Sequence, residues 1–356
     1  MSISKFPLYI KATCFLVALY FLVTILYIGQ NLIVPLIYAT LMAILLNPVV
    51  KLLVRLKLGR TLAIIVSMIL SFSIVATLFI FISSQGSMFT ASVPVLIDKF
   101  YLLINDGIIN FSARFNLSAA SINEYIIKSK AEVMSHFSQV IGSTLSTIGG
   151  TLAVMLLIPV YIFMILFYQP LIIEFIYKLS GEENNINVNE MIAGTKNLIQ
   201  SYLVGLLIEA VIVAFLYSTG LFIIGIEYAI LLGIIGALLN IIPYLGGLIA
   251  ATLYAIVAFT TKDSSSYILW VLMLFVLVHL IDNSYIIPKV VAAKVKINAL
   301  VAIAAVLAGG ALWGIAGMFL SIPLTGLLKL IFDRVDSLKA WGYLLGDTMP
   351  EKARKK

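Results

Sequence analysis

The sequence has one cysteine, two histidines and few charged residues. Charged side chains make up 11% of its 356 residues, whereas hydrophobic side chains make up 62%. Soluble domains usually carry about 25% charged and 45–50% apolar residues. A water-soluble fold of this composition would not have enough polar side chains to cover its surface. The excess of apolar residues therefore predicts a protein whose main solvent is lipid.

Several signatures of catalysis and ligand binding are also absent. The single Cys14 excludes a disulfide framework, and the distant His136 and His279 make a poor zinc site. We find no GxxxxGK[ST] loop, no HExxH helix and no GxSxG elbow. These absences argue against an enzyme and against ATP-driven transport by this chain alone, and we expect neither a metal nor a cofactor.

The apolar residues form continuous runs that are long enough to cross a membrane. A helix spans the hydrocarbon core in about 20 residues, whereas a barrel strand would show a shorter, alternating pattern. The clear runs are residues 8–28, 32–50, 61–83, 147–168, 202–225 and 267–288. The sequence predicts an all-α polytopic membrane protein with about six full spans in a single transmembrane domain, residues 1–356.

The basic residues lie beside the apolar runs, which favours a role in membrane orientation over nucleic-acid binding for the net charge of +7. One cluster follows the second run and another ends the chain: Lys51, Arg55, Lys57 and Arg60, then Lys352, Arg354, Lys355 and Lys356. Because basic residues concentrate in cytoplasmic loops, we expect both termini on the cytoplasmic side of a bacterial inner membrane.

Two polar regions between the runs have helical periodicity. Residues 86–146 have balanced charges, and Ser121 and Glu124 have the spacing of a capping box. We expect this region to be a small external helical insertion, either lying on the membrane and its neighbouring spans or forming a cap for a ligand or subunit. Residues 178–200 predict a second, short amphipathic helix on the inside.

Two apolar stretches, residues 227–260 and 298–332, are too long for one straight span. Helix-breaking residues interrupt them: Asn240, Pro243, Gly246 and Gly247 in the first, and Gly309, Gly310, Gly314, Gly317 and Pro323 in the second. Each stretch is either a re-entrant hairpin or a single tilted span with a break, and the distribution of lysines favours hairpins. Alternatively, the glycines permit close helix packing.

Ionisable side chains within the apolar runs are candidates for function, because a charge in hydrocarbon is unfavourable unless it is paired or hydrated. Glu209 lies in run 202–225, and helical spacing places His279, Asp282 and Asn283 on one face of run 267–288. In the hairpin topology Glu209 and Asp282 lie at one depth and can share a proton or cation site, with His279 or Asn283 tuning it. In the single-span topology they cannot meet. Alternatively, these side chains bond to neighbouring helices or face headgroups without a role in function.

Motifs of the C-terminal half have a characteristic order and spacing. They are Gly233-Ile234-Ile235-Gly236-Ala237-Leu238-Leu239-Asn240-Ile241-Ile242-Pro243-Tyr244-Leu245-Gly246, Asp282-Asn283, Ile287-Pro288-Lys289, Trp313-Gly314-Ile315-Ala316-Gly317 and Ser321-Ile322-Pro323-Leu324. This set resembles the autoinducer-2 exporter family of bacterial permeases, and the early spans extend the resemblance to nearly the whole chain. Gly247 stands where that family usually has proline, and Asn298-Ala299-Leu300 replaces a common His-Pro-Leu.

The resemblance implies a homo-oligomeric permease that exports a small polar solute such as autoinducer-2, or that exchanges sodium or lithium for protons. Our first hypothesis is a secondary transporter coupled to a proton or sodium gradient. Asp282 and Glu209 would bind the coupling ion, and Asn240, Pro243 and Gly246 would shape the site. The alternatives are a passive oligomeric channel and a membrane scaffold without transport. The motifs carry no code for the substrate.

Overall fold

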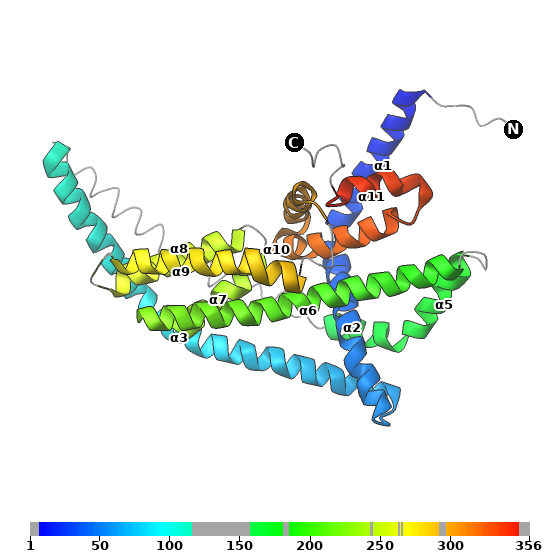
Figure 1. Cartoon of the computed structure of the whole chain (residues 1–356), viewed down its shortest axis with the longest axis horizontal. Helices are drawn as coiled ribbons and strands as arrows, with labels where there is room; N and C mark the ends of the chain where they lie inside the picture. The colour runs from blue at the N-terminus through cyan, green and yellow to red at the C-terminus, as the bar shows by residue number, and fades with distance from the viewer. Residues whose placement is uncertain are drawn as a thin grey trace. The chain divides into compact units, whose positions relative to one another are not determined.

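The computed structural model of the chain is helical (Figure 1). It describes residues 7–115, 157–180, 185–242, 245–262, 264, 266–291 and 297–348, and an isolated bridge between Ile297 and Gly346 is the only β pairing among them. Six helices of this part are long and apolar enough to cross a membrane: Tyr9–Ile28, Gln30–Arg55, Arg60–Ser87, Val188–Ile224, Ser266–Val290 and Ala299–Phe332. The predicted all-α polytopic membrane fold is confirmed.

The chain divides into two compact units. The first comprises residues 1–67, 153–201 and 294–356, and the second comprises residues 68–152 and 202–293. The long helices α3 (Arg60–Phe115) and α6 (Asn185–Ile224) contribute residues to both units.

The first unit contains parts of α3 and α6, two consecutive apolar helices near the N-terminus and a helical region near the C-terminus. Besides the parts of α3 and α6, its elements are α1 (Leu8–Ile28), α2 (Gln30–Arg55), the helix Leu157–Phe167, α5 (Gln169–Ser180), α10 (Ala299–Phe332), η4 (Asp336–Leu338) and α11 (Lys339–Leu345). Trp313 donates its indole N–H to the carbonyl of Leu26 in α1 (3.0 Å). Tyr38 of α2 stacks on Phe319 and donates to the carbonyl of Ala316 (3.2 Å). These contacts join α1 and α2 to α10.

A proline bends the chain between the helix Leu157–Phe167 and α5, which meet at 64°. Pro170 has no N–H, so it cannot donate to the carbonyl of Leu166, its partner four residues earlier. The guanidinium of Arg60 donates to that carbonyl instead, at 2.9 Å. A side chain of α3 thus satisfies the carbonyl that the proline frees.

The same replacement occurs inside α2. Pro48 leaves the carbonyl of Ile44 without its helical donor. The side-chain amide of Gln200 donates to this carbonyl at 2.6 Å and thereby ties α6 to α2 within the first unit.

Helix α10 is a hairpin. Trp313 and Gly314 leave the helical conformation, Gly314 with a φ of 59° that favours glycine. A Cβ added to Gly309 would lie 2.5 Å from the carbonyl oxygen of Gly317, whereas residues eight apart in a straight helix are about 12 Å apart. The second half therefore folds back onto the first. Gly309 and Gly310 are points of close packing, and the break lies a few residues beyond them.

The residues that replace His-Pro-Leu form a helix cap. The Asn298 side chain accepts a hydrogen bond from the N–H of Val301 (2.9 Å), which is the usual role of an N-cap asparagine. Its amide also donates to the carbonyls of Leu344 (2.7 Å) and Gly346 (3.0 Å). One side chain thus starts α10 and fixes α11 beside it.

The second unit is organised around a pair of short helices, α7 (Ala229–Asn240) and α8 (Leu245–Thr261). Their 12 and 17 residues correspond to about 18 and 26 Å, short of a hydrocarbon core of about 30 Å. The hydroxyl of Tyr254 donates to the carbonyl of Leu232 (3.1 Å), and Gly236 leaves room for the Tyr254 ring. Helices α7 and α8 therefore pack as a hairpin, and the predicted break at 240–247 is confirmed.

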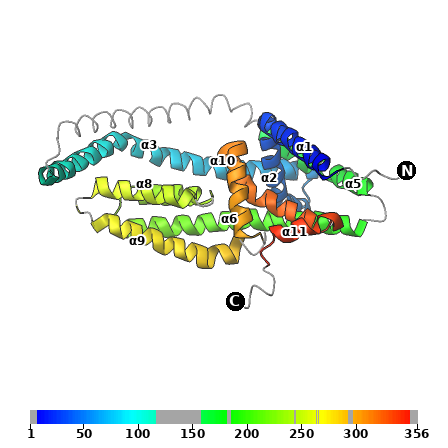
Figure 2. The same cartoon turned by 90° about the horizontal axis from the view of Figure 1, so that it is seen from above.

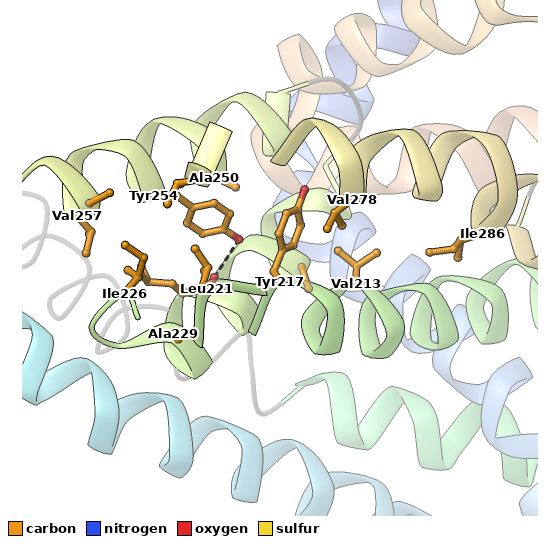
Figure 3. Close-up of a cluster of buried hydrophobic side chains, with 14 residues drawn as sticks. Val213, Tyr217, Leu221, Ile226, Ala229, Ala250, Tyr254, Val257, Val278 and Ile286 are labelled. Atoms are coloured by element: carbon orange, nitrogen blue, oxygen red, sulfur yellow. Dashed lines mark hydrogen bonds between the residues drawn. The ribbon is translucent and has the colours of Figure 1, made fainter. Parts of the chain in front are cut away.

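Helices α6, α8 and α9 (Ser266–Ile281) surround a buried core in this unit (Figures 2 and 3). Tyr217 of α6 and Tyr254 of α8 lie side by side with ring centroids 5.3 Å apart. The other buried members are Val213, Leu221, Ile226, Ala229, Leu232, Ala237, Ala250, Val257, Ala258, Val271, Val278 and Ile286. The π-helical segment η2 (Asp282–Val291) follows α9 directly.

Two polar regions differ from, or extend beyond, the predicted elements. Residues 185–200 are the first part of the continuous 40-residue helix α6 and do not form a separate short helix. Helix α3 continues from the third span to Phe115, well into the predicted insertion 86–146. The rest of that insertion, with its proposed capping box, lies outside the described residues.

The α7–α8 hairpin predicts a strong effect of Gly246→Ala. An added Cβ would overlap the backbone carbonyl oxygen of Leu239, which cannot move without opening the turn. We expect a loss of stability of about 1–3 kcal/mol, measured by thermal unfolding of the purified protein in detergent. Gly59→Ala is the control, because no atom lies within 4 Å of the added Cβ. Equal stability of the two variants would contradict the packing of the hairpin.

Candidate functional site

Three polar side chains from different elements meet in the second unit. Asn240 donates through its side-chain amide to Glu209 of α6 (Nδ2–Oε1 3.2 Å) and to Asp282 of η2 (Nδ2–Oδ2 2.8 Å). Glu209 is only 6% exposed and Asp282 only 2%. The sequence predicted that the two acids can share a site, and the structure brings them together through one amide.

Local sequence explains how each group reaches this point. Helix α7 ends at Asn240, three residues before Pro243, so the asparagine lies at the end of the short helix. Asp282 opens the π-helical segment, which contains Pro288. A π-helical turn is rare, is wider than an α-helical one, and occurs frequently at functional sites.

The hydrogen bonds leave the cluster electrically unbalanced. The Asn240 amide has two N–H donors for two acidic side chains, and Asp282 Oδ1 is buried with no hydrogen-bond partner among the described residues. Among these residues, neither Glu209 nor Asp282 forms an ion pair with a basic side chain. Burying two unpaired carboxylates is strongly unfavourable, so a proton or a bound cation would stabilise the cluster.

His279 and Asn283 lie on a different side of the same segment. Both side chains are exposed, and the Asn283 amide bonds to the His279 ring (2.9 Å) and to its carbonyl (3.0 Å). Asp282 is buried together with Val278 and Ile286. The predicted face of His279, Asp282 and Asn283 is therefore divided, with Asp282 buried and the other two exposed. The structure does not bring His279 or Asn283 into hydrogen-bond contact with Glu209 or Asn240.

The predicted helix-break residues have different positions. A Cβ on Gly247 would lie 3.9 Å from the Asn240 side-chain oxygen, so this glycine borders the cluster, and Gly246 forms the tight turn beside Leu239. Pro243 lies outside the described residues. Gly309 and Gly310 belong to the α10 hairpin of the first unit.

A row of aromatic rings next to the cluster was not identified from the sequence as part of the site. Tyr217 is buried and stacks on Phe275 (centroids 6.5 Å apart). Phe275 stacks in turn on His279 (5.5 Å). A tyrosine in the middle of an apolar span is the signal in the sequence, although tyrosines in such spans also serve simply as packing residues.

The fold and the cluster together define a class of protein. Acidic side chains buried among membrane helices, beside a hairpin of helices too short to span, are typical of proteins that move ions or solutes across the membrane.

Comparison with known proteins agrees with this class. The chain belongs to the AI-2E transporter family, because the model for "AI-2E family transporter" matches residues 16–337. It is 29% identical to "Putative transport protein YueF" of Bacillus subtilis, over 84% of this chain and 82% of that protein.

Two further relatives show similarity over nearly the full length. A protein of Haemophilus influenzae that is also named for transport is 26% identical, over 90% of this chain and 91% of its own. YhhT of Escherichia coli K12 is 24% identical, over 91% of this chain and 90% of its own. The resemblance in the C-terminal motifs is confirmed, and the chain is a membrane transporter of this family.

The shared amide predicts that Asn240 stabilises the fold. In Asn240→Ala two buried carboxyl groups lose their donor, which should reduce the free energy of unfolding by about 1–3 kcal/mol. Asn283→Ala is the matched control, since its side chain is exposed and, within the described part of the chain, bonds only to His279. Thermal unfolding in detergent measures both. A smaller loss in Asn240→Ala than in Asn283→Ala would contradict the proposed role of the amide.

Proposed function

We propose that the chain is a secondary transporter that exports a small polar solute and is coupled to a proton or sodium gradient. The carboxyl groups of Glu209 and Asp282 bind the coupling ion, and Asn240 positions them. The observation that carries this proposal is the pair of buried acids that share one amide donor without a basic partner among the described residues. A bound cation stabilises such a pair in one conformational state, and a change to a state of lower affinity releases the cation.

Family membership supports two kinds of substrate. One is a small polar signal such as autoinducer-2, after which the family is named. The other is sodium or lithium itself, exchanged for protons. Both use a site that binds a cation or a proton, so the same cluster serves either reaction. A passive pore is the competing function, and it would show conductance that neither saturates nor depends on a driving gradient.

We further propose that the chain forms one transmembrane domain with residues 86–146 as an insertion, that it assembles as a homo-oligomer, and that both termini face the cytoplasm of a bacterial inner membrane. The basic connection between α2 and α3 supports this orientation.

Neutralising one acid tests the coupling. Asp282→Asn removes the charge but keeps the size of the side chain, so sodium- or lithium-driven proton movement in proteoliposomes should fall to the level of empty vesicles. A pH-sensitive dye in the vesicle lumen measures this movement, and size-exclusion chromatography confirms that the variant remains folded.

Glu174→Gln is the control for this experiment, because Glu174 is exposed and already paired with Lys178. It should transport like the unaltered protein. Unchanged proton movement in Asp282→Asn would overturn the coupling role. If neither ion drives proton movement in the unaltered protein, uptake of candidate solutes under an imposed proton gradient is the next assay, with the same two variants.

Accessible cysteines test the topology. In a Cys14→Ser background, Lys262→Cys and Lys294→Cys are treated with a membrane-impermeant thiol reagent from outside. The two-hairpin topology places residue 262 outside and residue 294 inside, so only the cysteine at 262 should react. Labelling at 294 alone would support single tilted spans.

A further inference from the structure

A cavity of about 310 Å³ lies in the first unit, lined by basic side chains on an apolar floor. Lys51 and Arg55 come from the end of α2, and Arg60 comes from the start of α3. Val50 and Leu166, both buried, line it as well. None of these residues belongs to the acidic cluster of the second unit.

No acidic side chain of the described part of the chain balances the positive charge around this cavity. Among the described residues, Lys51, Arg55 and Arg60 form no ion pair, whereas Lys178 and Lys339 each pair with a nearby carboxylate. An anion between Lys51, Arg55 and Arg60 would reduce the repulsion between their like charges and supply acceptors to their N–H groups.

The arginine at the rim is held in place by the backbone. Arg60 donates one N–H to the carbonyl of Leu166, which Pro170 leaves without its helical donor. A guanidinium has five N–H groups in a fixed plane, so four are left for another acceptor. A planar, oriented fork of donors is well suited to phosphate oxygens.

A buried amide adds a neutral donor. Asn47 is only 5% exposed, lines the cavity, and has no hydrogen-bond partner among the described residues. Its amide is not among the fully buried side-chain groups that lack a partner, so it is accessible from the cavity and can donate to a ligand oxygen there.

The cavity lies at a membrane face. Helix α2 ends at Arg55 and α3 begins at Arg60, and both are candidate spans, so their connection lies at the level of the lipid headgroups. Orientation of the protein requires basic residues at this level but requires neither a cavity nor an amide inside it. Membrane orientation alone therefore does not explain the cavity and the amide that lines it.

We propose that this cavity binds a phosphate group, and that the headgroup of an anionic phospholipid supplies it. Lys51, Arg55 and Arg60 neutralise the phosphate, Asn47 donates to one of its oxygens, and the apolar floor contacts the adjoining glycerol and acyl carbons. Basic pockets between membrane helices bind anionic headgroups in this way. The site is independent of the proposed ion coupling.

The test compares three forms of the full chain purified in detergent. The first is unaltered, the second is Lys51→Gln with Arg55→Gln, and the third is Lys178→Gln with Lys339→Gln. The second form keeps the Arg60–Leu166 bond, and the third loses the same number of charges from lysines that are exposed and already paired. Native mass spectrometry measures binding of phosphatidylglycerol and of phosphatidylcholine, and isothermal titration measures binding of inorganic phosphate.

We expect phosphatidylglycerol to bind the second form about tenfold more weakly or worse, since two charge-assisted contacts are lost. The third form should bind like the unaltered protein, and phosphatidylcholine should bind weakly to all three. Inorganic phosphate that binds the unaltered form but not the second would support the phosphate site with a soluble source. Equal binding of phosphatidylglycerol to all three forms, with no binding of inorganic phosphate, would overturn the proposal.

Discussion

The side-chain amide of Asn240 donates to two buried carboxyl groups, and the arrangement of the second unit depends on this contact. The amide reaches both acids because α7 is short and ends where the hairpin turns. The turn is possible because Gly236 and Gly246 allow α8 to approach α7 closely. Small residues in the hairpin thus determine the positions of the Glu209 and Asp282 carboxyl groups. Because these groups are buried, their positions determine what the site can bind.

The same constraint on polar groups explains much of the first unit. Two carbonyls freed by prolines accept hydrogen bonds from Arg60 and Gln200, and the indole of Trp313 donates to the end of α1. Among the described residues, Asp282 Oδ1 is the only fully buried side-chain oxygen or nitrogen without a partner. Polar groups are satisfied where they serve the fold. The unsatisfied oxygen lies in the acidic cluster, one of the two places where we infer a ligand.

The sequence predicted the helical membrane fold and the two broken stretches, because run length and helix breakers act locally. It also left open that Glu209 and Asp282 share a site, and the structure brings them together through Asn240. It did not separate Asp282 from His279 and Asn283, because helical spacing places them within one broad face and only packing shows which side is buried. It predicted a separate helix before residue 200, although no proline interrupts 185–224 and α6 is continuous. The pairing of Arg60 with the Leu166 carbonyl joins residues 106 apart in the chain, which no local pattern can predict.

We propose that Glu209 and Asp282 bind and release a proton or cation. Infrared difference spectroscopy on the purified transporter, recorded while the sodium concentration or the pH is changed, observes carboxyl groups directly. We predict a carboxyl band that responds to the change and that is lost or shifted in both Glu209→Gln and Asp282→Asn. A spectrum with no responding carboxyl band, or with one that persists unaltered in both variants, would contradict the account.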